Sequence, residues 1–239
     1  TANHPWFTPV VLAASAHSAG KTYAQAIEGK WHMAEPIPES VKSMIVMDAE
    51  ADAEEIARQV DFVFCAVNMK KDEIKALEEK YAKLECPVVS NNSAHRHTPD
   101  VPMVVPEINA GDVKLHHGII ANPNCSTIIT LTAINALRKL SPIHSMVVST
   151  YQAVSGAGTG GPIELQNEID ALRDGKVYAP KVFAHQIAYN VIPQIGGEQC
   201  DGYTSEEMKL QNEGRKILHL PDMNVACTCV RVPVVRSHS

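Results

Sequence analysis

Short apolar runs alternate with amphipathic segments through the first half of the chain. The runs predict strands at residues 10–14, 44–47, 62–67, 88–89 and 118–121. Residues 70–84 carry apolar positions at three- and four-residue spacing, which predicts a crossover helix, and residues 54–60 predict a shorter one. Pro87 is expected to stop the longer helix before the next strand. This βαβ rhythm predicts a parallel sheet.

The pattern changes after Pro123. The expected elements are helices at 126–140 and 162–173, a third helix that opens on the capping box of residues 204–207, and strands at 146–154 and 225–235. A Gly-rich turn at 156–161 follows the first of these strands. The predicted fold class is therefore α/β, with a parallel-sheet domain at residues 1–123 and an α+β domain at residues 124–239.

Composition narrows the class of protein. The 239 residues are 45% hydrophobic and 20% charged, with a net charge of −6 and a pI near 6.0. No basic stripe suits nucleic acid, no apolar run is long enough to span a membrane, and no secretory signal is recognisable, so a cytoplasmic protein is expected. The six cysteines are irregularly spaced and form no Cys-x-x-Cys pair, which favours reduced thiols and disfavours a metal site.

Cys125 is the candidate nucleophile. It stands in Asn122-Pro-Asn-Cys-Ser-Thr127, where an apolar strand ends and an amphipathic helix is expected to begin. At a helix N-terminus the macrodipole and the unpaired N–H groups favour a thiolate and can stabilise an oxyanion. The alternative for any single cysteine is a buried structural residue.

Other polar residues have two interpretations each. His238 follows the last predicted strand and could accept a thiol proton, or it is an ordinary surface histidine. Arg231 and Arg236 could bind a carboxylate or phosphate, or be solvated strand ends. Glu206 and Lys209 share a helix face, where a surface ion pair is the alternative to a binding site.

The segment Gly156-Ala-Gly158-Thr-Gly-Gly161 matches the dinucleotide pattern G-x-G-x-x-G. It lies deep in the second half, however, and no acidic residue ends a following strand at the distance that the pattern requires. We expect this turn to form the rim of an active site rather than a cofactor-binding loop.

Taken together, these segments resemble the aspartate-semialdehyde dehydrogenase family over nearly the whole chain. The stretches that carry the resemblance are residues 4–7, 13–21, 90–96, 105–109, 122–127, 149–158, 206–209 and 231–239. The resemblance implies that Cys125 is the nucleophile and His238 the acid/base, with Gln152 and Asn124 as active-site neighbours. It implies NADP-dependent, reversible reductive dephosphorylation of aspartyl phosphate to aspartate semialdehyde through a cysteine thioester, in lysine, threonine and methionine biosynthesis.

The resemblance also implies which residues bind the charged groups of the substrate and phosphate. Arg231 and Glu206 would hold the carboxylate and amino group of the substrate, while Arg96 and Lys209 would hold phosphate. Such a family member is expected to form a homodimer or a dimer of dimers. The fold implied is a partial Rossmann-like NADP-binding domain followed by a catalytic and dimerisation domain.

The residues that follow the predicted strand at 10–14 bear on the choice between NAD and NADP. NAD enzymes usually end the second strand with an acidic residue that binds the ribose 2′-hydroxyl, whereas residues 10–14 are followed here by Ser15. Ser15, Ser18 and Lys21 place hydroxyls and a positive charge where a 2′-phosphate would lie, so NADP is favoured. The resemblance adds Asn92, Ser155 and Gly156 to the cofactor site.

The chain departs from the family pattern at its ends. Family members begin with a strand and a Gly-rich phosphate loop before the His-Pro segment, and they continue beyond the His-Ser pair. Without that turn, little hydride transfer is expected of these 239 residues alone. The alternatives are a related phosphorylating dehydrogenase, such as N-acetyl-glutamyl-phosphate reductase or glyceraldehyde-3-phosphate dehydrogenase, and a catalytically inactive dimeric binding module.

Overall fold

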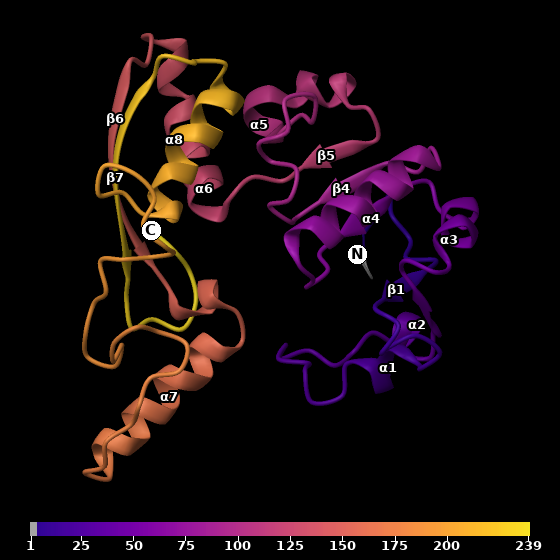
Figure 1. Cartoon of the computed structure of the whole chain (residues 1–239), viewed down its shortest axis with the longest axis horizontal. Coiled ribbons are helices and arrows are strands. Elements are labelled where there is room, and N and C mark those ends of the chain that lie inside the picture. Colours follow the sequence, from indigo (N-terminus) through magenta and orange to yellow (C-terminus); the bar gives the residue numbers. More distant parts are fainter. Residues whose placement is uncertain (1–3) are drawn as a thin grey trace. The chain divides into compact units, whose positions relative to one another are not determined.

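The computed structural model describes residues 4–239, which fall into two compact units (Figure 1). The first comprises Thr1–Val104 and Gly111–Asn122, and the second Val105–Ala110 and Pro123–Ser239. Residues 105–110, placed in the first domain by the sequence prediction, group here with the second unit. Helix α5 (Pro106–Asn109) packs on helices of the second unit, and Asn135 Nδ2 donates to the Glu107 carbonyl at 2.8 Å.

Five short parallel strands lie in the described part of the first unit. Strand β1 (Leu12–Ala14) pairs with β2 (Val46–Asp48), and a separate sheet contains β3 (Val63–Cys65), β4 (Val88–Ser90) and β5 (Ile119–Ala121). Each falls within or beside a predicted apolar run. The single sheet that the βαβ rhythm suggested is wrong in one respect: β1 and β3 are not paired, and residues of both strands line an apolar cavity of about 610 Å³.

The helices of the first unit are α1 (Tyr23–Ala26), α2 (Glu39–Lys42), α3 (Ala53–Gln59), α4 (Lys71–Lys83) and the 3₁₀ helix η1 (Ala110–Leu115). Helix α4 buries Ile74, Leu77 and Tyr81, which confirms the predicted apolar stripe. The helix ends at Lys83, before Pro87. Leu84 is its C-cap, and Glu85 has the left-handed conformation, with φ 57°.

The second unit has two long parallel strands. Strands β6 (Ser145–Gln152) and β7 (Asn224–Arg231) pair in register from Ser145 opposite Asn224 to Gln152 opposite Arg231. Helices α6 (Cys125–Asn135) and α8 (Ser205–Leu218) lie together on one face of this pair (Figure 1). The predicted capping box at Thr204 and Glu207 is confirmed. The α/β class predicted from the sequence is confirmed as well.

Two elements of this unit, α6 and β7, are shorter than the sequence predicted. Helix α6 ends at Asn135, followed by the 3₁₀ helix η2 (Leu137–Lys139), and it is not amphipathic, since Ile129 is 46% exposed. Strand β7 ends at Arg231 because the chain turns at Pro233, which has no N–H for a ladder. The chain then returns antiparallel along β6 and places His238 opposite Gln152.

Helix α7 (Gly160–Arg173) follows the 3₁₀ helix η3 (Val154–Ala157) and is held by two buried carboxylates. Glu164 accepts the backbone N–H groups of residues 181–183 at 2.6 to 2.9 Å. One turn later, Glu168 Oε2 accepts those of Ile187 and Ala188 at 2.9 and 2.7 Å. These bonds fix a segment that has no regular structure of its own.

Replacing Glu168 by alanine is expected to lower the free energy of unfolding by about 2–4 kcal/mol, because two buried backbone donors lose a charged acceptor. Urea unfolding followed by circular dichroism measures the change. Asp170→Ala on the same helix is the control, since its ion pair with Arg173 is exposed and contributes less than about 1 kcal/mol. Equal losses in the two variants would contradict the prediction.

Among the described residues, no helix combines the length and the apolar character needed to cross a membrane.

Candidate active site

Cys125 is the first residue of α6, as the sequence predicted. Asn124 caps the helix, and its side-chain oxygen accepts the N–H groups of Ser126 at 3.0 Å and Thr127 at 3.4 Å. The Cys125 side chain is exposed, in contrast to its buried neighbours Asn124 and Ser126. The N-terminus of a helix has several N–H groups without a partner inside the helix. Because Asn124 occupies two of them, the donor left in the first turn is the N–H of Cys125 itself.

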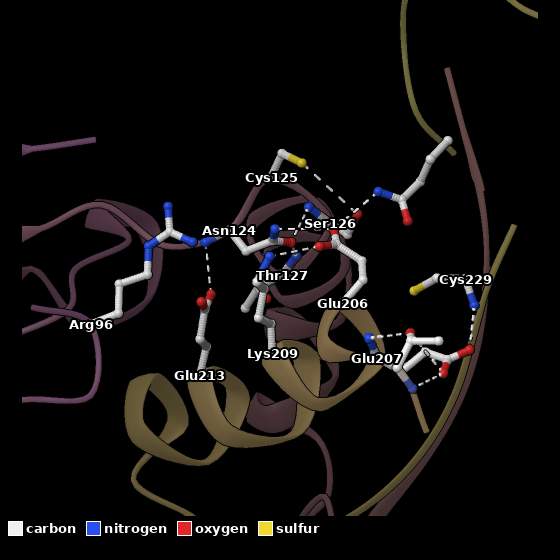
Figure 2. A network of polar contacts seen from close by, with 12 residues as sticks. Arg96, Asn124, Cys125, Ser126, Thr127, Glu206, Glu207, Lys209, Glu213 and Cys229 are labelled. Atoms are coloured by element: carbon white, nitrogen blue, oxygen red, sulfur yellow. Dashed lines mark hydrogen bonds and ion pairs between the residues drawn. The ribbon is translucent and has the colours of Figure 1, made fainter. Parts of the chain in front are cut away.

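Glu206 is the hub of a buried polar network (Figure 2). Its Oε1 accepts from Asn124 Nδ2 and from Gln152 Nε2, each at 3.1 Å, while Oε2 pairs with Lys209 Nζ at 2.9 Å. The Glu206 side chain is 8% exposed and that of Lys209 is 33% exposed. The surface ion pair considered from the sequence is therefore the wrong interpretation of these two residues.

Electrostatics keep Glu206 ionised. Burial acts to raise the pKa of its carboxyl group, but the hydrogen bond and charge of Lys209 outweigh it, with help from the amides of Gln152 and Asn124. The net result is a pKa below the ordinary value. The network thus presents a fixed negative charge beside the amides that surround it.

Arg231 lies at the end of β7, directly opposite Gln152 in the ladder. It is 6% exposed, and its Nη1 donates to the Ala153 carbonyl at 2.6 Å. Burial lowers the pKa of Arg231, and the negative charge of Glu206 acts in the opposite direction. A buried cation near the cysteine is a suitable partner for an anionic group.

His238 comes to the same place by the return of the chain along β6. Its Nδ1 lies 3.0 Å from the Ser237 carbonyl and 2.9 Å from the Ala153 nitrogen, contacts that require opposite tautomers. The Ala153 N–H also reaches the Ser237 carbonyl, at 3.2 Å. Nδ1–H donation to that carbonyl therefore satisfies every group and leaves Nε2 as a proton acceptor.

Gly156 explains how this packing is achieved. A Cβ on residue 156 would lie 2.6 Å from Arg231 Nη1 and 3.3 Å from the His238 ring. At Gly161, a Cβ would meet the Val154 carbonyl at 2.0 Å. These glycines permit close approach of the chain at the end of β6. Ser155 is bonded through its N–H to the Val235 carbonyl at 3.2 Å.

The remaining predicted site residues lie in the first unit. Arg96 is 7% exposed and donates to the Asn91 carbonyl at 3.2 Å. Asn92 Nδ2 contacts Cys65 Sγ at 3.4 Å and Glu78 Oε1 at 3.5 Å.

Ser15, Ser18 and Lys21 form the turn after β1, in which the Ser18 N–H bonds to the Ser15 carbonyl at 2.9 Å. Ser15 and Lys21 are exposed. The nearby acidic residue Asp48, paired with Ala14, turns its carboxylate to the N–H groups of Glu50 and Ala51. The turn therefore offers hydroxyls and a cation, and fits an anionic group.

Sequence reasoning missed several buried residues of the site. Glu213 of α8 is fully buried and accepts the Asn124 N–H at 2.7 Å. Glu207 caps α8 and also accepts the Cys229 N–H at 3.0 Å, and Thr150 donates to Gln152 at 3.1 Å. The seven-residue spacing of Glu206 and Glu213, which puts both on one face of a helix, was the available signal.

Sequence models of one family match most of the chain. A model described as "Semialdehyde dehydrogenase, NAD binding domain" matches residues 1–116, and one described as "Semialdehyde dehydrogenase, dimerisation domain" matches residues 134–239. The chain belongs to the semialdehyde dehydrogenase family. Its first unit is thus the family's nucleotide-binding domain, and its second unit carries the dimerisation domain.

The curated relatives that the chain matches here share one name, aspartate-semialdehyde dehydrogenase. The chain is 45% identical to the aspartate-semialdehyde dehydrogenase of Bacillus subtilis (strain 168), over 69% of this chain and 50% of that protein. It is 49% identical to the enzyme of the same name from Aquifex aeolicus (strain VF5), over 67% of this chain and 48% of that protein. The chain therefore spans about half the length of the curated relatives it matches.

Solved structures agree with the fold. Aspartate semialdehyde dehydrogenase II from Vibrio cholerae, also solved complexed with ASA, is 35% identical with a TM-score of 0.81, over 95% of this chain and 63% of that one. The enzyme from Candida albicans, solved with NADP, is 27% identical with a TM-score of 0.72, over 99% of this chain and 63% of that one.

Proposed function

We propose that the chain carries the catalytic residues of an NADP-dependent aspartate-semialdehyde dehydrogenase. The observation that carries the proposal is the gathering of a helix-start cysteine, a histidine and a buried arginine with Glu206 and Gln152 in one unit. A structural cysteine would need none of these neighbours. The names of the relatives support the choice of substrate.

Cys125 acts as the nucleophile on the aldehyde carbon of aspartate semialdehyde. His238 Nε2 takes the proton from the resulting hydroxyl group, which the tautomer with Nδ1–H on Ser237 allows. The Cys125 N–H stabilises the developing oxyanion, since it is the open donor of the first turn of α6. Bound NADP supplies the hydride acceptor, and phosphate then cleaves the thioester to give aspartyl phosphate, a sequence that biosynthesis runs in reverse.

Charged residues hold the two ends of the substrate. Arg231 binds its carboxylate and Glu206 its amino group, with Gln152 and Asn124 fixing Glu206 from the opposite side. Lys209 and Arg96 bind phosphate. Each assignment pairs a group of fixed charge with a substrate group of opposite charge.

The turn after β1 supports NADP over NAD. Ser15, Ser18 and Lys21 bind the 2′-phosphate, because this turn has hydroxyls and a cation and its acidic neighbour Asp48 is engaged with backbone N–H groups. Asn92, Ser155 and Gly156 complete the cofactor site.

Substrate protection tests the proposal without turnover. Iodoacetamide at neutral pH is expected to label Cys125 faster than the exposed Cys200, and aspartate semialdehyde is expected to slow labelling at Cys125 alone. Phosphate-dependent reduction of NADP by the full-length protein, with the whole cofactor domain, is the second measurement. Equal labelling of both cysteines, with no protection by the aldehyde, would show that the proposed function is wrong.

Steric exclusion at Gly156 gives a further prediction. Gly156→Ala is expected to lower kcat/KM by about 10–100-fold, because the new methyl group displaces Arg231 and His238, and misplacement by about 1 Å costs about 10²-fold. Gly197→Ala is the matched control, since nothing lies within 4 Å of its Cβ position. Equal kinetics of the two variants would contradict the prediction.

We propose that the protein forms a homodimer through the face of β6 and β7 that α6 and α8 leave uncovered. Val147 is 88% and Tyr151 57% exposed on this face, and the dimerisation-domain match includes both strands. Val147→Glu is expected to convert the dimer to a monomer in light-scattering measurements, because it places two charges in an apolar contact. Val177→Glu, at the 99% exposed residue after α7, is the control. A dimer that survives Val147→Glu would place the contact elsewhere.

A further inference from the structure

We infer that Glu213 is a positioning residue that fixes Cys125 for attack through the backbone of Asn124. The inference rests on the proposed function of Cys125 as nucleophile. Glu213 reaches the cap of α6 through the main-chain N–H of Asn124.

The burial of Glu213 needs a compensating partner. Its side chain is 0% exposed, and taking a carboxylate out of water costs several kcal/mol unless donors replace the lost water. Oε2 accepts the Asn124 N–H at 2.7 Å, across 89 residues of sequence (Figure 2). This short contact, from a charged acceptor to a main-chain donor, is of the strong kind.

Asn124 is held at three points. Glu213 holds its main-chain nitrogen, Glu206 accepts from its side-chain nitrogen, and its side-chain oxygen accepts the first N–H groups of α6. Glu206 and Glu213 are seven residues apart on α8, which is two turns or about 10 Å along the axis. Two residues of α8 therefore hold Asn124, one through its backbone and one through its side chain.

The conformation of Asn124 decides where the reacting groups of Cys125 point. Asn124 has φ −63° and ψ 146°, and its ψ sets the plane of the peptide whose N–H belongs to Cys125. That N–H is the donor left open in the first turn, and the thiol leaves the same residue. A rotation of this peptide would therefore turn the nucleophile and the oxyanion donor together.

Three variants test the inference. Glu213→Gln keeps an acceptor oxygen, Glu213→Asp withdraws it by one methylene, and Glu213→Leu removes it. Glu164→Leu is the matched control, because Glu164 is equally buried and also accepts backbone N–H groups, but those of residues 181–183. The readouts are the iodoacetamide rate at Cys125, corrected for folded fraction by urea unfolding, and kcat and KM, each measured on the full-length protein.

We expect Glu213→Leu to lower both the Cys125 alkylation rate and kcat about 10–100-fold, with KM changed less than about 3-fold, because reacting groups displaced by about 1 Å cost about 10²-fold. Glu213→Gln should stay within about 3-fold of the wild type, and Glu213→Asp should lower kcat by about 10-fold. Glu164→Leu should leave the corrected alkylation rate unchanged.

If Glu213→Leu does not fold, the aspartate variant decides. Wild-type alkylation and kcat in a folded Glu213→Asp or Glu213→Leu variant would overturn the inference, as would a loss in Glu164→Leu equal to that in Glu213→Leu. Alkylation needs neither substrate nor cofactor, so it is separable from the proposed function. Retained activity in Cys125→Ser would instead refute the function and leave the effect of Glu213 on thiol reactivity intact.

Discussion

In the full-length protein, replacing Cys125 by serine is expected to lower phosphate-dependent reduction of NADP by about 10³-fold or more. Serine preserves the shape of the side chain, and because Cys125 is exposed the change costs little stability. A hydroxyl, however, remains protonated at neutral pH and is a far weaker nucleophile toward the aldehyde. Initial rates with aspartate semialdehyde, phosphate and NADP measure the loss.

Cys200→Ser is the matched control for this substitution. Cys200 is also exposed, but its nearest sulfur contact is Met208 at 4.0 Å and it takes no part in the Glu206 network. Its replacement should leave the rate within about 2-fold of the wild type, as surface substitutions usually do. More than a tenth of the activity in Cys125→Ser would refute the nucleophile assignment.

Replacing His238 by asparagine is expected to lower kcat by about 10²–10⁴-fold, the usual contribution of a positioned acid/base. The asparagine amide can still bond near Ser237 and Ala153, so the returning chain keeps its place beside β6. What is lost is the acceptor at Nε2. The kcat should fall far more than KM rises, because the ring is not assigned to substrate binding.

His144→Asn provides the control for the histidine. His144 precedes β6 at the end opposite Gln152, and its side chain is exposed. A loss of kcat below about 10-fold in His238→Asn would assign the proton transfer to another group or to water.

Local patterns predicted much of the fold. The apolar stripe of α4 and the capping box of α8 involve residues three or four apart, and so they appeared in the structure as expected. The cap of α6 placed Cys125 at the helix start for the same reason. Where an element ended was harder to predict, because the end of β7 depends on the turn at Pro233 and on a return path along another strand.

The site was predicted only as a set of residue types. Asn124 and Gln152 reach Glu206 across 82 and 54 residues of sequence, and no periodicity reports contacts at that separation. The sequence offered a surface ion pair as the alternative for Glu206 and Lys209, yet the structure buries the glutamate beneath two amides. Glu213, Glu164 and Glu168 accept backbone N–H groups that lie 89, 17 and 19 residues away, and no local pattern reports such contacts.

The sequence by itself determined the α/β class, the family resemblance and the position of Cys125 at a helix start, because these depend on residues within a turn or two of each other. Only the tertiary structure decided which donors remain open beside that cysteine, and that Arg231, His238 and Gly156 meet at the end of β6. Those contacts depend on how distant segments pack. A hydrogen bond between buried groups forms only after the chain has brought them together.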